Sequence, residues 1–385
     1  MFTLSSQCPD LWHYLQHAQR AGKKIVLYGM GNGADKIWNV CDRYGITVHG
    51  VFASDGFVRG QVFHGTVVQA FDAICTQHGA DALIVLLSFA SSRPEVLDTI
   101  ARVASICELY APDVPVFGDT LFDADFYNAH KADLEAVRSL LADDVSRQVL
   151  DDVILYKLSG DLSPLHRSAH SYSDEEVMKD ILHAEGFKTA VDLGAYTGDT
   201  IRELLTWSPD LHTVVAMEPD RRNFKKLNLY ASEETRCKIH AVQAGAWSCT
   251  DTLIFDSSGN RNANIQAVNP SDFIPAAKKS EPVAVDAPDH ILASFGLSNT
   301  AVDYVKFDIE GSEAEAIAGC SETIKNHRPA LCVSLYHRSE DLFALPLLLH
   351  RMAPNYQLFL RRKAGIPAWD LNLYAVTKND GTSPQ

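Results

Sequence analysis

The sequence predicts an α/β protein built on mostly parallel sheets, and three observations support that class. Short apolar runs typical of buried strands alternate with segments of helical spacing along most of the 385 residues. Two of the runs lead directly through a glycine turn into a helix, at residues 25–34 and 190–200. Single cores seldom grow beyond about 250–300 residues, so two domains are expected. We place a smaller Rossmann-like domain at 1–120, a helical connector at 121–172 and a second α/β domain at 173–385.

Composition and charge narrow the class of partner. The net charge of −15 argues against a nucleic-acid partner, because phosphates would be repelled over most of the surface. The start of the chain has no basic, apolar signal segment, and the longest apolar run, 82–90, is about half the ~20 residues that a membrane-spanning helix needs. The eight cysteines form no C-x-x-C pair, which indicates reduced thiols rather than a zinc site. We therefore expect a cytoplasmic protein without a membrane partner.

The first half of the chain shows a small α/β unit followed by helices. An amphipathic helix is expected at 10–21 and a further helix after Pro94. The expected strands are 25–28, 47–52 and 82–87. A helical apolar stripe covers 123–158, and the helical pattern is broken after it by residues 159–161 and Pro164. Residues 166–172 are expected to be a polar loop.

The second half alternates strands and helices and then ends in two adjoining strands. The expected core strands are 190–193, 213–217, 239–242, 302–309 and 330–336. Residues 252–255 and 264–265 suggest a hairpin, and 282–285 an added extended segment. The last two strands, 356–360 and 371–377, are expected to close the sheet as an antiparallel pair.

The earlier glycine turn matches G-x-G-x-x-A, a form of the dinucleotide fingerprint. Its glycines are Gly29, Gly31 and Gly33, and Asp55 stands about 20 residues later, where a ribose-binding acid is expected. The turn predicts a site for a nucleotide, a nucleotide sugar or coenzyme A. The alternative, that the glycines serve only the tight turn and helix packing, stays open.

The later turn carries an acid at the tip of its strand and a second acid at the tip of the next strand. Asp192 precedes Gly194 and Gly198, and Glu218 follows strand 213–217. Both tips fall on the carboxyl edge of a parallel sheet, where ligands bind, and a glutamate there can accept hydrogen bonds from both ribose hydroxyls. Asp192 disfavours a bare phosphate and suits hydroxyls, an ammonium or a sulfonium. The pair therefore predicts S-adenosylmethionine and a class I methyltransferase sheet.

A charged strand and a histidine supply the candidate chemistry. On a strand, Lys306, Asp308 and Glu310 would share one face, although a central parallel strand should be apolar on both faces. Charges there are costly unless they are paired or functional. His337 follows strand 330–336, so it should lie at the same edge and could serve as a general base. A divalent metal at Asp308 and Glu310 is an alternative that their spacing does not support, so we assign no metal site.

Residues 172–378 resemble the FkbM-type S-adenosylmethionine-dependent methyltransferases. The resemblance rests on Glu218-Pro219, Gly245-Ala246-Trp247, Arg328-Pro329, Tyr336-His337 with Asp341-Leu342, and the segments 191–200 and 303–313, of which the K-x-D-x-E-G-x-E element is the most specific. Tyr196 departs from the pattern, since many class I enzymes have glycine there, and it should narrow the methionine end of the site.

The resemblance implies methyl transfer from S-adenosylmethionine, usually to an oxygen of a small-molecule acceptor such as a natural product or a sugar. The implied cofactor residues are Asp192, Gly194, Ala195, Tyr196, Gly198, Glu218 and Pro219. His337, Asp308 and Glu310 become the acceptor-side candidates, with Lys306 pairing the acids. Two rival readings remain, namely a nucleotide- or NAD-dependent sugar-modifying enzyme that uses the Gly29 turn, and a binding module with a vestigial methyltransferase site.

Overall fold

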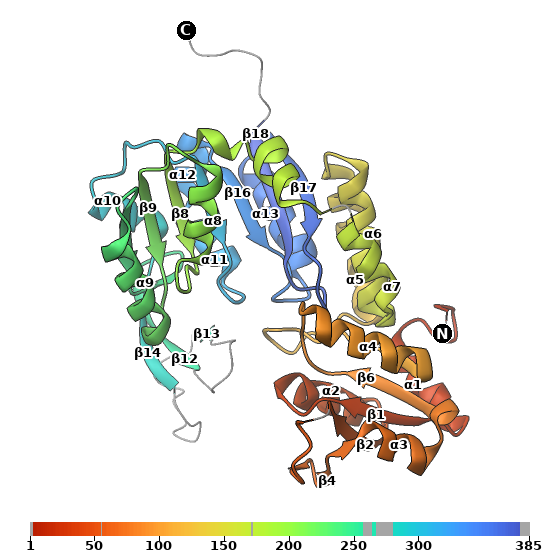
Figure 1. Ribbon diagram of the computed structural model, residues 1–385. Helices are drawn as coiled ribbons and strands as arrows, with labels where there is room; N and C mark the ends of the chain where they lie inside the picture. Colours follow the sequence, from red (N-terminus) through yellow and green to blue (C-terminus); the bar gives the residue numbers. More distant parts are fainter. Residues whose placement is uncertain (1–2, 55, 171, 257–263, 267–279, 378–385) are drawn as a thin grey trace.

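The computed structural model describes residues 3–54, 56–170, 172–256, 264–266 and 280–377. The chain forms two lobes, with the amino-terminal sheet in one and a larger sheet in the other (Figure 1). The three-part division at residues 120 and 172 stays a prediction. Asp55, a member of the predicted nucleotide site, lies outside the described residues.

The amino-terminal lobe contains a five-stranded parallel sheet in the order β5-β2-β1-β6-β7. Its strands are β1 (Lys24–Tyr28), β2 (Val48–Ala53), β5 (Gln69–Ala70), β6 (Leu83–Leu87) and β7 (Glu108–Tyr110). Its helices are α1 (Leu11–Arg20), α2 (Asn32–Arg43), α3 (Phe71–His78) and α4 (Pro94–Ile106), and a short hairpin, β3 (Val62–Phe63) with β4 (Thr66–Val67), lies beside them. The strand order reverses at β1, as in a doubly wound sheet.

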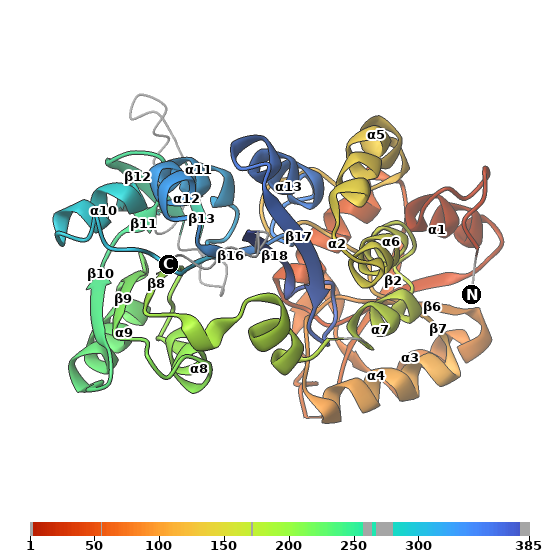
Figure 2. The ribbon, with the colours of Figure 1, turned by 90° about the horizontal axis from the view of Figure 1, so that it is seen from above.

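Three helices connect the lobes, namely α5 (Ala124–Leu140), α6 (Asp144–Ser159) and α7 (Leu162–His170). The prediction of a polar loop at 166–172 is wrong for its first part, because α7 continues to His170. Pro164 lies in the first turn of α7, where a missing N–H breaks no helical hydrogen bond. The connecting helices lie along the outer strand of the larger sheet in both ribbon views (Figures 1 and 2).

The larger sheet has seven strands in the order β10-β9-β8-β15-β16-β18-β17. These are β8 (Thr189–Leu193), β9 (Thr213–Met217), β10 (Lys238–Val242), β15 (Tyr304–Phe307), β16 (Ala330–Ser334), β17 (Tyr356–Arg362) and β18 (Leu371–Thr377). All neighbours are parallel except β18, which is antiparallel to β16 and β17. The predicted sheet class, with its antiparallel terminal pair, is confirmed.

Helices cover both faces of this sheet (Figure 2). One face packs against α11 (Glu313–Gly319), α12 (Ser321–His327) and α13 (Asp341–Met352), and the other against α8 (Asp199–Trp207) and α9 (Arg221–Glu233). The remaining elements are η1 (Ala80–Ala82), η2 (Glu176–Ile181), η3 (Ala184–Gly186), α10 (Pro288–Ser294), β11 (Gly245–Ala246), β12 (Asp251–Asp256), β13 (Asn264–Gln266) and β14 (Ser280–Asp286). Strands β11, β14, β12 and β13 form a separate sheet that includes the predicted hairpin. No helix in the described part of the chain has both the length and the apolar character that crossing a membrane requires.

The central strand is shorter than predicted. The sequence suggested a strand at 302–309 whose face would carry Lys306, Asp308 and Glu310, but β15 ends at Phe307. Glu310 has a φ of 55° and Gly311 a φ of 94°, so the backbone turns away from the sheet there. The prediction of a shared strand face is therefore wrong for Glu310, although all three residues remain at the carboxyl end of β15.

A buried arginine fastens the larger sheet to the connecting helices. Arg361 of β17 is 2% exposed, and its guanidinium donates to Asp143 at 2.7 Å and to Glu176 at 2.7 Å. It also donates to the hydroxyl of Ser146 at 2.9 Å. Planar, bidentate pairing of this kind suits arginine better than lysine.

We expect Arg361→Ala to lower the free energy of unfolding by roughly 2 kcal/mol, because it leaves two partly covered carboxylates without a cation. Urea denaturation measures the change. Arg138→Ala is the matched control, since Arg138 pairs with Asp151 where the two side chains are 48% and 42% exposed. That control should change stability by no more than about 0.5 kcal/mol. Equal effects of the two variants would contradict the assignment.

Candidate active site

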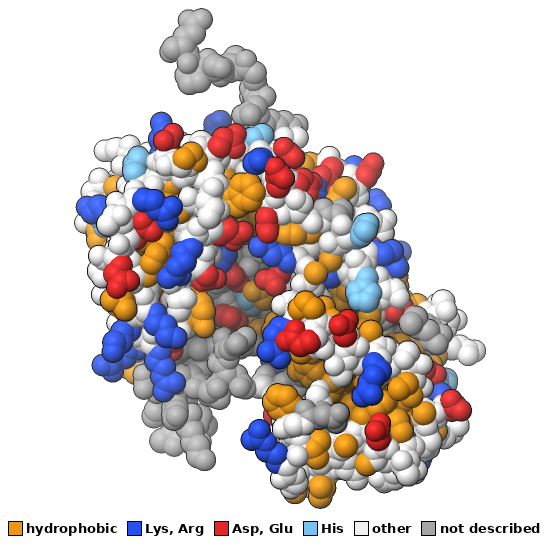
Figure 3. Space-filling view, in the orientation of Figure 1, with side chains coloured by type: hydrophobic (Ala, Val, Ile, Leu, Met, Phe, Trp, Pro, Cys, Tyr) orange, Lys and Arg blue, Asp and Glu red, His pale blue; other side chains and the backbone are white. Residues whose placement is uncertain are grey.

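Four parallel strands of the larger sheet deliver polar residues to one edge. Asp192 lies within the carboxyl end of β8, Glu218 follows β9 and Asp308 follows β15 directly, and His337 comes shortly after β16. The carboxyl ends of parallel strands form the ligand-binding edge of an open α/β sheet. Figure 3 shows acidic side chains gathered around the hollow between the two lobes.

The turn between β8 and α8 is built by two left-handed glycines. Gly194 has a φ of 84°, and a Cβ there would lie 1.9 Å from the backbone oxygen of Asp308. Gly198 has a φ of 85°, and a Cβ there would lie 2.6 Å from the ring of Tyr230. The protein's own packing therefore requires both glycines, and their predicted contact with the cofactor stays a prediction. Ala195, between them, is buried and donates its N–H to the carbonyl of Met217 at 3.0 Å.

Glu218 is held by the backbone on both sides. Its carboxylate accepts from the N–H of Tyr196 at 2.9 Å and from the N–H of Asp220 at 2.8 Å, and the residue is 6% exposed. Pro219 is followed by Asp220, whose side chain caps the amino terminus of α9. Burial raises the pKa of Glu218 to about 7, although both backbone N–H groups lower it. An ionised carboxylate can accept about four hydrogen bonds, and Glu218 accepts two from the backbone. It can therefore accept further hydrogen bonds from a ligand.

Asp192 is a buried carboxylate with no hydrogen-bond partner for either oxygen among the described residues. Its nearest cation is on Lys306, which lies opposite it in the register of β8 and β15. Burial raises the pKa of Asp192 to about 6, while Lys306 lowers it. An unsatisfied buried acceptor costs about 1–3 kcal/mol, so this position suits a ligand that brings a donor. The ammonium group of S-adenosylmethionine fits that requirement.

Lys306 and Tyr336 hold Asp308. The ammonium of Lys306 lies 3.0 Å from one oxygen of Asp308, and the hydroxyl of Tyr336 donates to the other at 3.0 Å. Burial opposes the charge on Lys306, but Asp308 and Asp192 raise the pKa of the ammonium above its ordinary value. Burial also opposes the charge on Asp308, but Lys306 and His337 hold the pKa of this carboxyl well below its usual range. Lys306 and Asp308 are therefore both charged.

His337 is fully buried among three carboxylates. Its Nδ1 lies 2.9 Å from Glu313, outside hydrogen-bond alignment, and its Nε2 lies 3.6 Å from both Asp308 and Glu310. Burial lowers the pKa of His337, but Glu313, Asp308 and Glu310 outweigh burial and raise it to about 9. His337 is therefore a cation at neutral pH, and a protonated histidine cannot accept a proton.

Glu310 is the most exposed of the three acids around His337. Its side chain is 36% exposed, whereas His337 is 0% exposed. Burial raises the pKa of Glu310 to about 7, with Asp308 and Glu313 adding to the rise and His337 opposing it. A carboxyl that titrates near neutral pH, and that a ligand can reach, has the properties of a general base.

The sequence had given Glu313 no site role. Its Oε1 accepts from the N–H of Ile309 at 3.0 Å and lies 2.9 Å from His337, so it holds the 309–311 turn against the histidine. Its place at the start of α11 is also that of an ordinary helix-start acid, so the sequence alone could not separate the two roles. Tyr336 belongs to the residues that carry the resemblance, but nothing in the sequence indicated that its hydroxyl donates to Asp308.

The earlier glycine turn lies on the other sheet. A Cβ on Gly29 would lie 2.6 Å from the hydroxyl of Ser88, and one on Gly33 would lie 2.3 Å from the Ser88 carbonyl. Packing therefore accounts for these two glycines. Gly31, which caps α2, has open space beside it. The turn leads from β1 of the amino-terminal sheet into α2, and the structure does not describe Asp55. In the parts of the chain that it does describe, no group of three or more His, Cys, Asp or Glu residues is arranged to hold a metal ion.

This sheet order, with a glycine turn after β8 and an acid after β9, is that of the class I S-adenosylmethionine-dependent methyltransferase fold. Residues 192–357 match the family model of the methyltransferase FkbM domain. This part of the chain is accordingly an FkbM methyltransferase domain, and the protein is a methyltransferase that uses S-adenosylmethionine.

One of the solved structures that match shares the fold over most of both chains. The methyltransferase FkbM from Methylobacillus flagellatus KT matches with a TM-score of 0.67 and 21% identity over 94% of this chain and 92% of that chain, so the likeness extends into the amino-terminal lobe. Precorrin-6y C5,15-methyltransferase from Geobacter metallireducens GS-15 gives a TM-score of 0.32 at 11% identity, over 54% of this chain and 90% of that chain. Fibrillarin from Aeropyrum pernix, with S-adenosyl-L-methionine natively bound, gives a TM-score of 0.29 at 11% identity, over 50% of this chain and 66% of that chain. No curated protein matches the sequence.

The raised carboxyl pKa values predict that stability falls as pH rises. Asp192, with a pKa of about 6, and Glu218 and Glu310, with pKa values of about 7, bind protons more tightly in the folded chain than in the unfolded chain. Their stabilising contribution is complete below the unfolded values near ~4 and is lost as pH rises through 6 to 7. His337 acts in the same direction up to its pKa of about 9.

We therefore expect the melting temperature of the ligand-free protein to decrease between pH 5 and pH 8, measured by scanning calorimetry. Asp192→Asn should weaken this dependence by roughly 1.4 kcal/mol over the interval, because it removes one buried group that titrates at a pKa of about 6. Asp210→Asn, at an exposed position, should leave the dependence as in the wild type. A melting temperature that rises over this interval would show that the carboxyl pKa values are not elevated.

Proposed function

We propose that the protein transfers the methyl group of S-adenosylmethionine to the hydroxyl oxygen of a small-molecule acceptor, such as a natural product or a sugar-linked compound. The observation that carries this proposal is the placement of Glu310. It is accessible, its pKa is about 7, and it lies at the sheet edge that also carries Asp192 and Glu218. A hydroxyl acceptor must lose a proton when it is methylated, and Glu310 is suited to receive that proton.

The cofactor residues supply two different contacts. Glu218 would accept hydrogen bonds from the ribose hydroxyls, and the unpaired carboxylate of Asp192 would accept from the ammonium group. Gly194, Ala195, Gly198 and Pro219 shape the backbone around them, and the ring of Tyr196, 49% exposed on the turn, would narrow the methionine end. When bound, S-adenosylmethionine supplies an electrophilic methyl group.

The residues around Glu310 position it and set its charge. Methyl transfer is a direct displacement, so the protein contributes alignment and removal of one proton. His337 lies between Asp308 and Glu310 and carries a positive charge, so it stabilises the ionised form of Glu310. Lys306 and Tyr336 fix Asp308 on the other side. We therefore assign His337 a positioning role and propose Glu310 as the base.

The charge of the protein favours a small acceptor over a nucleic acid. The net charge is −15, and the acids around the hollow would repel a chain of phosphates. A small molecule can place its hydroxyl beside Glu310 without bringing many negative charges to this edge.

Binding of S-adenosylmethionine, measured by isothermal titration calorimetry, tests the cofactor assignment. Glu218→Ala should weaken binding by roughly 30- to 100-fold, because it removes charge-assisted bonds to the ribose. Glu233→Ala, at an exposed position on α9, should bind as the wild type does. Undiminished affinity in Glu218→Ala would remove the ribose role.

Turnover with an acceptor tests the base. The acceptor is identified by a mass-spectrometric screen of hydroxylated small molecules for transfer of an isotope-labelled methyl group. Glu310→Gln should then lower kcat by roughly 10²- to 10⁴-fold without changing the affinity for S-adenosylmethionine. His337→Gln should move the acid limb of the pH profile to higher pH, because Glu310 loses a neighbouring cation. Exposed Glu322→Gln serves as the control. Full turnover by Glu310→Gln would rule out its role as the base.

A further inference from the structure

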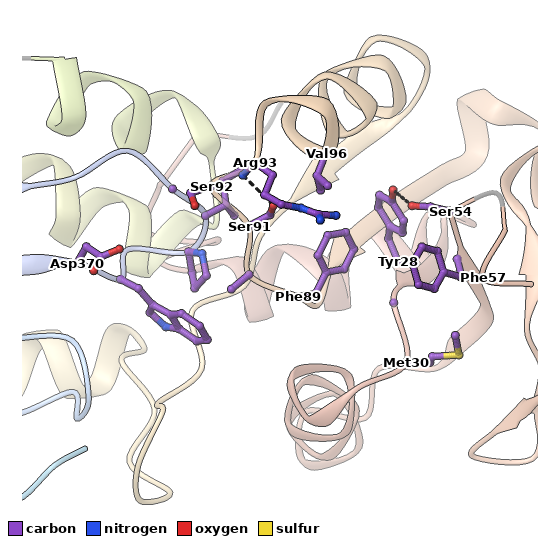
Figure 4. A pocket seen from close by; sticks show the side chains of 17 residues that line it. Tyr28, Met30, Ser54, Phe57, Phe89, Ser91, Ser92, Arg93, Val96 and Asp370 are labelled. Atoms are coloured by element: carbon purple, nitrogen blue, oxygen red, sulfur yellow. Dashed lines mark hydrogen bonds between the residues drawn. The ribbon is translucent and has the colours of Figure 1, made fainter. Parts of the chain in front are cut away.

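A cavity of about 630 Å³ lies between the two lobes, away from the cofactor residues (Figure 4). One wall comes from the amino-terminal lobe, at the carboxyl ends of β1, β2 and β6. The other wall comes from residues 365–370, the loop between β17 and β18. The strand order reverses at β1, and doubly wound sheets bind nucleotides in the crevice at such a reversal. The volume is typical of a site for a small molecule.

The two walls are joined by the backbone. The N–H of Ser91 donates to the carbonyl of Ile366 at 2.9 Å, and the N–H of Ile366 donates to the carbonyl of Ser91 at 3.0 Å. This isolated bridge links the loop after β6 to the loop after β17. The cavity is therefore a shared feature of both lobes.

Aromatic rings line the cavity from both sides. Tyr28, Phe57 and Phe89 come from the amino-terminal lobe, and Trp369 comes from the opposite loop. Phe57 is 60% exposed and Trp369 is 37% exposed, so a ligand in the cavity can reach both rings. Flat rings of this kind provide stacking surfaces for a nucleobase or a sugar face.

Charged groups of opposite sign lie at different places in the cavity. Arg93 pairs only loosely with Glu95, at 3.4 Å with side chains 70% and 68% exposed, so this pair contributes little. A phosphate can displace such a pair, because guanidinium binds phosphate oxygens with bidentate geometry. Asp370 lies across the cavity from Arg93 and Tyr28 (Figure 4).

Asp370 also links the cavity to the methyltransferase edge. Asp370 comes directly before β18, where the N–H of Leu335 donates to the carbonyl of Leu371 at 2.9 Å, and Leu335 is followed by Tyr336, whose hydroxyl donates to Asp308 at 3.0 Å. A ligand that reaches from Arg93 to Asp370 would therefore approach the side of the cluster that contains Asp308 and Glu310.

We propose that this cavity binds the nucleotide part of a nucleotide-linked acceptor. The base stacks on Phe57 and on Phe89, which the buried ring of Tyr28 supports from behind, the phosphate pairs with Arg93, and the hydroxyl-bearing group passes Asp370 toward Glu310. The direction of the ligand rests on the proposed function, because it assumes that the acceptor hydroxyl is methylated beside Glu310. Binding of the nucleotide does not depend on that assumption.

Titration of the full-length protein with ADP, CDP, GDP and UDP tests the cavity, with the matching nucleosides as phosphate-free probes. At least one nucleoside diphosphate should bind and change the tryptophan fluorescence, and Trp369→Phe should remove that change. Arg93→Gln should weaken binding of the diphosphate by at least about tenfold and leave binding of the nucleoside nearly unchanged. Arg102→Gln, at an exposed position on the same helix, is the control.

The affinity for S-adenosylmethionine separates this proposal from the proposed function. Arg93→Gln and Trp369→Phe should bind S-adenosylmethionine as the wild type does, and Glu218→Ala should still bind the diphosphate. Nucleotide sugars that bind more tightly than the free diphosphate, and that gain a methyl group, would support both proposals. The cavity proposal fails if none of the four diphosphates binds, or if Arg93→Gln binds them unchanged.

Discussion

The ammonium group of Lys306 is the interaction on which the site depends. It lies on the central strand β15, opposite Asp192 of β8 and 3.0 Å from Asp308. A charge on a central parallel strand would be costly without partners. One cation thus compensates two carboxylates and ties the turn after β15 to the strand that leads into the cofactor turn. The close approach of Gly194 to the backbone of Asp308 requires the same two strand ends to stay together.

Around this cation the site holds more carboxylates than positive charges. His337 is shared by Asp308, Glu310 and Glu313, and Asp192 has no hydrogen-bond partner within the described chain. Burial is the main reason why Glu218 and Glu310 both titrate at about 7, and neighbouring carboxyls add to the rise in pKa. Burial together with an excess of acid thus produces a group that can accept a proton at neutral pH.

The sequence predicted the features that depend on local pattern. Alternating apolar runs identified the strands, and the ends of the first two strands in the second half placed Asp192 and Glu218 at one edge. It could not predict what neighbouring segments do to these residues. The turn at Glu310, the helix at 162–170 and the contact of Ser88 with Gly29 and Gly33 all depend on packing between distant parts of the chain. The charge on His337 depends on Glu313, whose place at the start of α11 is also that of an ordinary helix-start acid.

The amino-terminal lobe is fastened to the site itself rather than to the far side of the sheet. The N–H of Phe117 donates to the carbonyl of His337 at 2.8 Å, and the guanidinium of Arg338 lies 3.9 Å from the ring centre of Phe117 while its Nε donates to Gly311. These contacts touch the neighbours of both His337 and Glu310. A ligand held by the amino-terminal lobe is therefore held in a fixed relation to the proposed base. Because alignment is the main contribution of a protein to methyl transfer, this joint gives the lobe a direct means of selecting the acceptor.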